Sequence, residues 1–165
     1  MKINEFQQAL GQVDLDKVQT LKDLVAAHKQ IIIIGNGGSN SIASHISQDY
    51  TKQLGKKCFS FSDPSRLTCY INDYGMEVAY KQFLKEFADR DSLVILISSS
   101  GNSENIVNCA KYCIDSEIKM ITLSGFSQKN KLKTLTEELC LHFWVDSSDY
   151  GIVECLHQVI LHTVV

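Results

Sequence analysis

Two histidines and two carboxylates have the side-chain types and the spacing to share one metal ion or one proton. His45 and Asp49 are four residues apart in a segment of helical periodicity, so both side chains lie on one face. Glu154 and His162 are eight residues apart in the apolar C-terminal stretch, within about 80° of each other around a helix. His157 lies about 140° from His162, so those two histidines do not share a site. These pairs suit metal ligation, or a base with its orienting partner; an ordinary hydrogen-bonded pair is the alternative for each.

Two loops rich in glycine and serine have the composition of an anion-binding site. Residues 35–41 read GNGGSNS, and their glycines permit backbone conformations and a close ligand approach that other residues exclude. Residues 98–103 read SSSGNS, so four hydroxyl groups meet free backbone N–H groups where a helix is expected to begin. Phosphate is the anion that such donors favour. A tight strand-to-helix turn with ordinary capping is the alternative for each loop taken alone.

Strands and helices alternate along the chain and predict the scaffold that positions these loops. Apolar runs without polar alternation are typical of strands buried on both faces, and they cover residues 31–34, 58–61, 92–98, 119–125 and 141–145. Helix-like stretches lie at residues 40–54, 76–88, 102–115, 129–137 and from 150 to the end. A helical lead-in covers residues 4–28, with a break expected near Asp14 to Asp16. We therefore expect an α/β fold with a parallel sheet covered on both faces, and ligands at the carboxyl ends of its strands.

Length and charge limit the domain organisation and the partners. The 165 residues suffice for one compact domain, which we expect to span residues 1–165, with a helical segment at 1–28 and an α/β core at 29–165. The net charge of −3, without a lysine or arginine cluster, argues against nucleic acid and membrane partners. No apolar run has the length of a membrane span. The six cysteines lie mostly in apolar stretches, which predicts buried free thiols and a cytoplasmic location.

The motifs occur in an order that resembles a known family. GNGGS is followed by SHISQD, SDPSRLTCYINDYG, SSSGNS, ITLSG and finally ECLHQVILH. This order resembles the SIS (sugar isomerase) domain and, within it, the phosphoheptose isomerase family. The resemblance implies a three-layer sandwich with a five-stranded parallel sheet in the flavodoxin-like strand order. It also implies a phosphorylated sugar as ligand and a homotetramer with sites at the subunit interfaces.

The resemblance further implies roles for individual residues. Its substrate-binding positions are Asn36, Gly37, Gly38, Asn72, Asp73, Ser98, Ser99, Ser100, Ser103 and Glu154, of which the serines form the phosphate pocket. Its zinc-binding positions are His45, Asp49, Glu154 and His162, and two of these, Asp49 and His162, are the expected catalytic base and acid. Asp49 stands where the best-known members have glutamate, and Glu154 stands where they have glutamine.

The activity implied is that of an aldose–ketose isomerase converting sedoheptulose 7-phosphate to D-glycero-D-manno-heptose 7-phosphate. That reaction is the first step of bacterial heptose biosynthesis for lipopolysaccharide or related glycans. A carboxylate and an imidazole beside the carbonyl suffice to move the protons through an enediol, and zinc would polarise the carbonyl. Two alternatives stay open: a non-catalytic phosphosugar-binding SIS module acting as an adaptor or regulator, and an isomerase of another sugar phosphate.

Overall fold

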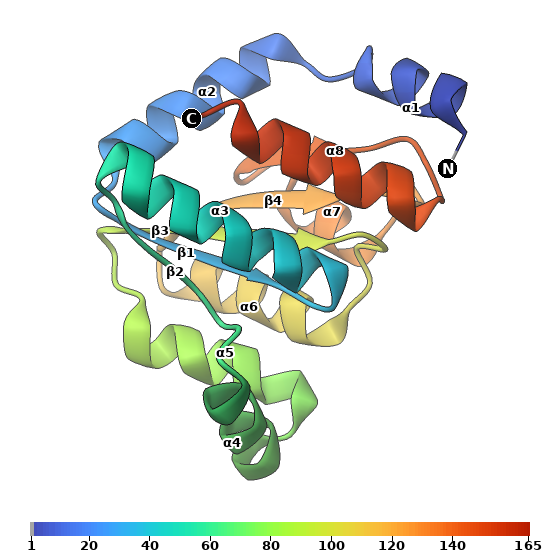
Figure 1. The fold of residues 1–165 in the computed structure, drawn as a ribbon. Coiled ribbons are helices and arrows are strands. Elements are labelled where there is room, and N and C mark those ends of the chain that lie inside the picture. Colours follow the sequence, from blue (N-terminus) through green and yellow to red (C-terminus); the bar gives the residue numbers. More distant parts are fainter. Residues whose placement is uncertain (1) are drawn as a thin grey trace.

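Five parallel strands form the centre of the structure, a computed structural model that describes residues 2–165 (Figure 1). The strands are β1 (Gln30–Gly35), β2 (Lys57–Ser60), β3 (Ser92–Ser98), β4 (Lys119–Ser124) and β5 (Leu141–Trp144). They pair in the order β2-β1-β3-β4-β5, which is the flavodoxin-like order. The predicted α/β fold class and all five predicted strands are confirmed, with boundaries that differ by one residue or less.

Helices surround this sheet. Their bounds are α1 (Ile3–Leu10), α2 (Leu15–Ala27), α3 (Gly38–Leu54), α4 (Pro64–Tyr74), α5 (Met76–Phe87), α6 (Glu104–Asp115), α7 (Lys131–Thr136) and α8 (Tyr150–His162). None of the helices within residues 2–165 combines the length and the apolarity that crossing a membrane requires. Asp14 accepts hydrogen bonds from the backbone at the start of α2, and this cap explains the predicted break between α1 and α2.

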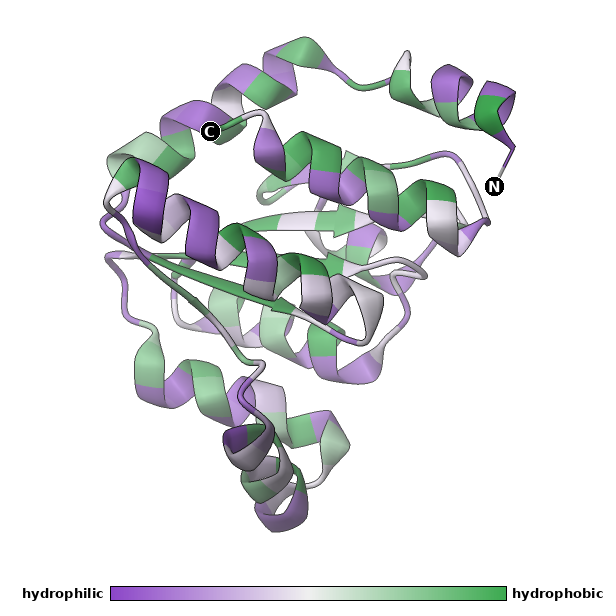
Figure 2. Cartoon of the chain, viewed as in Figure 1, coloured by the Kyte–Doolittle hydropathy of each residue, from purple (hydrophilic) through white to green (hydrophobic). Residues whose placement is uncertain are grey.

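The isoleucine run in β1 shows why the sheet is covered on both sides. Ile31 and Ile33 belong to a core formed with α2, α3 and α8, whereas Ile32 and Ile34 belong to a core formed with α5 and α6. All four side chains are fully buried, because successive residues of a strand point to opposite faces. Figure 2 shows the same arrangement as hydrophobic strands between helices whose outer faces are hydrophilic.

One helix is missing from the sequence prediction. Residues 64–74 form α4, which packs against α5 and projects away from the sheet (Figure 1). The signal was present, because Asp63 accepts a hydrogen bond from the backbone of Arg66 and Pro64 occupies the first helical position. The apolar periodicity was present too, because Leu67, Tyr70, Ile71 and Tyr74 have helical spacing, although none of them is fully buried.

The prediction for the cysteines is correct in part. All six thiols are free, and Cys109 and Cys113 are buried. Burial raises the pKa of Cys113 to about 12, so that this thiol stays protonated and unreactive. Cys69 and Cys155 are instead exposed, on α4 and α8. The expectation of buried thiols is wrong for these two, because each lies on the outer face of an amphipathic helix.

Candidate functional site

The glycine loop lies between β1 and α3. Gly37 precedes α3 with φ of 53° and ψ of −121°, a conformation that favours glycine. A Cβ added to Gly35 would lie 2.7 Å from the backbone of Ser39, so the strand and the helix approach too closely for a side chain there. The Asn36 side chain exchanges two hydrogen bonds with Asn105 of α6, at 3.0 and 2.9 Å. Asn105 was not singled out in the sequence, and it ties the glycine loop to the neighbouring helix.

The serine loop lies between β3 and α6. Ser98 and Ser103 bring their hydroxyl oxygens to 3.3 Å, and Ser100 accepts a hydrogen bond from the backbone of Asn102 at 3.2 Å. Gly101 between them has φ of 66°, which lets the chain reverse before the helix begins. In the sheet, Gly35 of β1 pairs with Ile97 of β3, so the serine loop and the glycine loop lie side by side.

The two loops share one cavity of about 260 Å³. Its walls contain most of the predicted substrate-binding residues, and they also contain Ser39 and Tyr150, which were not predicted to bind substrate. The lining residues are Asn36, Gly37, Gly38, Ser39, Ile97, Ser98, Ser99, Ser100, Ser103, Tyr150 and Glu154. The cavity is therefore rich in hydroxyl groups and lies at the N-termini of α3 and α6, where backbone N–H groups favour an anion.

Glu154 is the carboxylate of this cavity. The Ser99 hydroxyl donates to Glu154 Oε1 at 3.4 Å. A Cβ added to Gly38 would lie 2.3 Å from Glu154 Oε2, so the carboxylate sits directly against the first residue of α3. A side chain at position 38 would displace the Glu154 carboxylate from this place. A carboxylate at a helix N-terminus is stabilised by the helix dipole.

A second group of polar side chains lies between α3 and α8. His45 Nε2 and His162 Nε2 are each 3.3 Å from Asp49 Oδ2, and the two imidazole rings are 5.2 Å apart between centroids. The ligand atoms of these three residues all lie within 4.8 Å of one another. His162 Nδ1 is 3.0 Å from the carbonyl oxygen of Gln158, and only a protonated Nδ1 can donate there. With the proton on Nδ1, Nε2 carries the lone pair through which a neutral imidazole binds a metal.

The structure does not bring every predicted residue to these two places. Glu154 is absent from the His45–Asp49–His162 group, because eight residues of helix separate it from His162, about 12 Å along the axis. Asn72 and Asp73 lie on α4, where Asn72 Nδ2 donates to Asp73 Oδ1 at 3.0 Å. Neither of them lines the cavity that holds the serine loop.

Comparisons with known proteins identify the family. A family model described as the SIS domain matches residues 7–125. The phosphoheptose isomerase of Fusobacterium nucleatum is 30% identical over 152 residues, which cover 89% of this chain and 76% of the relative. The phosphoheptose isomerase of Cytophaga hutchinsonii is also 30% identical, over 82% of this chain and 72% of the relative. The solved structure of phosphoheptose isomerase from Neisseria gonorrhoeae superposes with a TM-score of 0.86 at 22% identity, covering 98% of this chain and 89% of that chain. The chain therefore belongs to the SIS domain family and, within it, to the phosphoheptose isomerases.

Proposed function

We propose that the protein is an aldose–ketose isomerase that converts sedoheptulose 7-phosphate to D-glycero-D-manno-heptose 7-phosphate. The observation that carries this proposal is the pairing of a hydroxyl-rich cavity with an acid–base group along the same helix, α3. The cavity at the N-terminus of α3 suits a phosphorylated ligand, and the acid–base group farther along α3 suits proton transfer. The relatives from Fusobacterium nucleatum and Cytophaga hutchinsonii carry the name of this activity. A binding module would need the cavity alone, so the second group favours the enzyme over the adaptor or regulator.

The substrate phosphate is assigned to the serine loop. Ser98, Ser100 and Ser103 supply hydroxyl donors, and α6 begins at the next residue with its unpaired backbone N–H groups. The N-terminus of α3 already has Glu154 against it. A phosphate dianion is therefore repelled from that side of the cavity and favoured at α6. Glu154 accepts hydrogen bonds only, so its partners in the substrate are sugar hydroxyl groups.

Proton transfer is assigned to Asp49 and His162. Asp49 would remove the proton from C1 of the ketose, and His162 would give a proton from Nε2 to the carbonyl oxygen at C2, so that a 1,2-enediol results. This step needs a His162 ring protonated at both nitrogens, because Nδ1 already donates to the Gln158 carbonyl, and such a ring does not bind a metal at the same time. Return of a proton to C2 and removal of the proton from the C1 hydroxyl group then complete the aldose. Asp49 Oδ2 faces both imidazoles, and within residues 2–165 no donor contacts Oδ1. This oxygen is the one we expect to take the C1 proton.

The same group fits a divalent metal, which we propose is zinc. Tetrahedral zinc with bonds of about 2.0–2.1 Å places neighbouring ligand atoms about 3.3–3.4 Å apart. Both imidazole-to-carboxylate distances are 3.3 Å. His45 and Asp49 would hold the ion, joined by His162 while its Nε2 carries no proton, and at least one position would stay open, as in catalytic sites. When bound, zinc supplies a Lewis acid that polarises the substrate carbonyl. Glu154 stays a predicted ligand that this arrangement does not support, because of its distance from the group.

We expect purified protein to isomerise sedoheptulose 7-phosphate and to contain one equivalent of zinc per chain. The measurement is a panel of five-, six- and seven-carbon ketose phosphates, with elemental analysis of protein prepared without chelator. Chelation should abolish the activity and added zinc should restore it, because the metal polarises the carbonyl. A His45→Ala variant should lose the metal and leave the serine loop untouched. If no ketose phosphate reacts with zinc supplied, the enzyme proposal fails and the binding-module alternative replaces it.

A homotetramer with sites at its subunit interfaces is part of the proposal. The helix α4 has no buried residue, and the hairpin that it forms with α5 exposes large apolar side chains. Tyr74, Met76, Val78 and Phe87 are between 36% and 46% exposed. A second copy of the chain would cover this surface. It would also give Asn72 and Asp73 of one copy a cavity to reach in another, since their own cavity does not contain them.

We expect light scattering at micromolar concentration to give about four times the 18.5 kDa chain mass. Subunit mixing provides the sharper test of the shared site. An Asp73→Ala variant and an Asp49→Asn variant should each be inactive, and their mixture should regain part of the activity, because a hybrid interface contains both native residues. A monomer in solution would refute the assembly. Active mixtures from two inactive parents cannot arise if each site belongs to one chain.

A further inference from the structure

A group of buried polar side chains lies beneath the serine loop, between β4, β5 and α7. Each member is at most 4% exposed: Thr122, Ser124, Asn130, Thr136 and His142. Buried polar groups persist when every donor and acceptor has a partner. The proposed reaction uses none of these side chains, so their retention in the core needs another explanation.

The segment that precedes α7 holds the serine loop in place. The backbone N–H of Leu132 donates to the carbonyl oxygen of Gly101 at 2.9 Å, and the backbone N–H of Lys131 donates to Asn102 Oδ1 at 3.0 Å. A Cβ added to Gly101 would lie 2.0 Å from Asn130 Oδ1, so the loop lies directly on the Asn130 side chain. The position of residues 130–132 therefore sets the position of the loop.

The orientation of the Asn130 amide follows from its neighbours. Its Oδ1 accepts the backbone N–H of Lys133 at 2.8 Å and caps α7. Its Nδ2 faces three acceptors, namely Ser124 Oγ at 3.0 Å, the Gly125 carbonyl at 3.1 Å and the Ser127 carbonyl at 2.8 Å. Because an amide nitrogen donates only, Ser124 Oγ accepts from Asn130 and has its own hydrogen left to donate.

The remaining hydrogen bonds then have one consistent direction. Ser124 Oγ lies 3.1 Å from His142 Nε2, which accepts the hydroxyl hydrogen. The proton of the imidazole is therefore on Nδ1. His142 Nδ1 donates to Thr122 Oγ1 at 2.6 Å, and Thr122 donates to Thr136 Oγ1 at 2.9 Å. Thr136 donates to the carbonyl oxygen of Leu132 at 2.8 Å. The path begins at residue 130 and ends at residue 132, the two sides of the contact with the serine loop.

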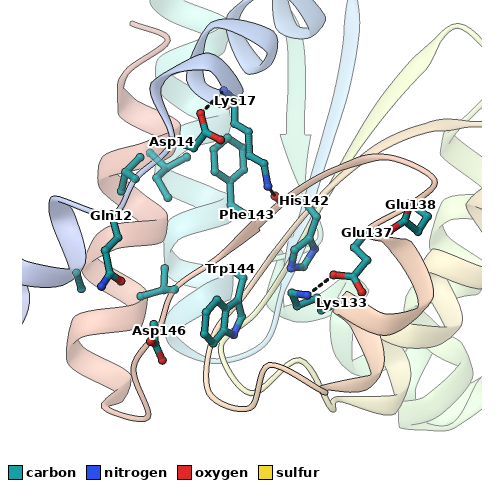
Figure 3. A pocket seen from close by; sticks show the side chains of 14 residues that line it. Gln12, Asp14, Lys17, Lys133, Glu137, Glu138, His142, Phe143, Trp144 and Asp146 are labelled. Atoms are coloured by element: carbon teal, nitrogen blue, oxygen red, sulfur yellow. Dashed lines mark hydrogen bonds and ion pairs between the residues drawn. The ribbon is translucent and has the colours of Figure 1, made fainter.

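The opposite direction is less favourable. If His142 Nε2 carried the proton, Ser124 would accept twice and its hydrogen would have no acceptor in a buried place, which is costly. Burial lowers the pKa of His142 to about 4, so the imidazole is neutral. The positive charges of Lys133 and Lys17 act in the same direction, His157 adds to it, and Glu137 opposes it. Figure 3 shows Lys17 reaching the His142 backbone carbonyl, with Lys133 and Glu137 paired beside the ring.

We infer that these five side chains form one directed hydrogen-bond ring, closed by the backbone between Asn130 and Leu132, that fixes the serine loop for anion binding, with Asn130 and His142 as positioning residues. The inference rests on the proposed binding of the phosphate by that loop. The hydrogen-bond ring and the serine loop move together, because the loop contacts Asn130 and Leu132 and the two ends of the hydrogen-bond path lie at these same residues. Preorganised donors bind an anion more tightly than donors that must first be ordered.

The tautomer of His142 is the first test and needs no variant. Long-range proton–nitrogen NMR of ¹⁵N-labelled protein near neutral pH should show the proton on Nδ1 of His142. In a phosphate-free buffer this signature should be present before any ligand is added, because the ring is part of the fold. A proton on Nε2 would overturn the inference.

Replacement of the ring hydroxyls is the second test. Thr122→Val and Thr136→Val keep the β-branched shape, and each removes the two hydrogen bonds that its hydroxyl group makes in the ring. The probe is inorganic phosphate, whose Kd should rise about fivefold to tenfold in both variants. Thr134→Val makes the same chemical change on the exposed side of α7 and should leave the Kd unchanged. With the phosphosugar substrate, KM should rise in the ring variants while kcat stays within about twofold, since the proton-transfer groups are untouched.

The outcomes separate this inference from the proposed function. Wild-type protein that shows the Nδ1 tautomer and ring-dependent phosphate binding, yet isomerises no sugar phosphate, would contradict the isomerase and support the ring. Ring variants that bind phosphate as tightly as wild type would overturn the positioning role, whatever the enzyme assay gives.

Discussion

Asp49→Asn and His162→Asn are each expected to lower kcat for sedoheptulose 7-phosphate by more than ~100-fold, the lower range for loss of a general acid or base. Asparagine has nearly the shape of aspartate and cannot take a proton, and it cannot replace the imidazole as a proton donor. Both positions lie at the surface of the α3–α8 contact, with side-chain exposures of 18% for Asp49 and 34% for His162, so the fold should persist. Steady-state kinetics and circular dichroism of the two variants measure both effects.

The double variant and a longer carboxylate sharpen this test. Groups that act as one unit give non-additive losses, so the double variant should lose little more than the worse single variant. Asp49→Glu restores the carboxylate of the best-known phosphoheptose isomerases, and activity should hold or rise if the reach of Asp49 limits the rate. Near-normal kcat in either asparagine variant would remove Asp49 or His162 from proton transfer.

Acid is expected to destabilise the protein through two buried histidines. Burial lowers the pKa of His142 and of His157 to about 4, from an ordinary value of about 6.5. Between these values the unfolded chain binds more protons than the folded chain, so the free energy of unfolding falls as the pH falls. The stabilisation is fully present above pH ~6.5 and declines toward pH ~4, by ~3 kcal/mol for each histidine.

Urea unfolding between about pH 7 and about pH 4.5 measures this dependence. His157→Gln provides the comparison, because glutamine can still donate to the Ser124 carbonyl that His157 Nε2 contacts at 3.2 Å. The variant should lose part of the slope of stability against pH, since one fewer buried group must be protonated. An identical slope in wild type and variant would show that His157 titrates normally in the folded protein.

The sequence predicted the scaffold well because its signals are local. An isoleucine run has no polar face to expose, so β1 had to be buried on both sides, and Asp14 is placed to cap α2. The helix α4 was missed although Asp63, Pro64 and the helical spacing of Leu67, Tyr70 and Ile71 indicate it. It packs against α5, and these apolar residues are only half-buried against the core.

The sequence predicted most of the residues of the candidate site and did not predict correctly which of them lie together. Helical spacing correctly placed His45 beside Asp49, one turn apart. The same reasoning placed Glu154 with them because it shares a side of α8 with His162. Two turns of helix carry Glu154 to the glycine loop instead, where it contacts Gly38 and Ser99.

The sequence by itself determined the strands, most of the helices, the glycine and serine loops and the family, because these depend on residue types within short segments. Only the tertiary structure decided which distant residues meet: Asp49 with His162, Glu154 with the first turn of α3, and Asn130 with the serine loop. The physical reason is that such contacts depend on how far along a helix axis and at what angle two elements cross. Packing of the whole core sets these quantities, and spacing within one element does not contain them.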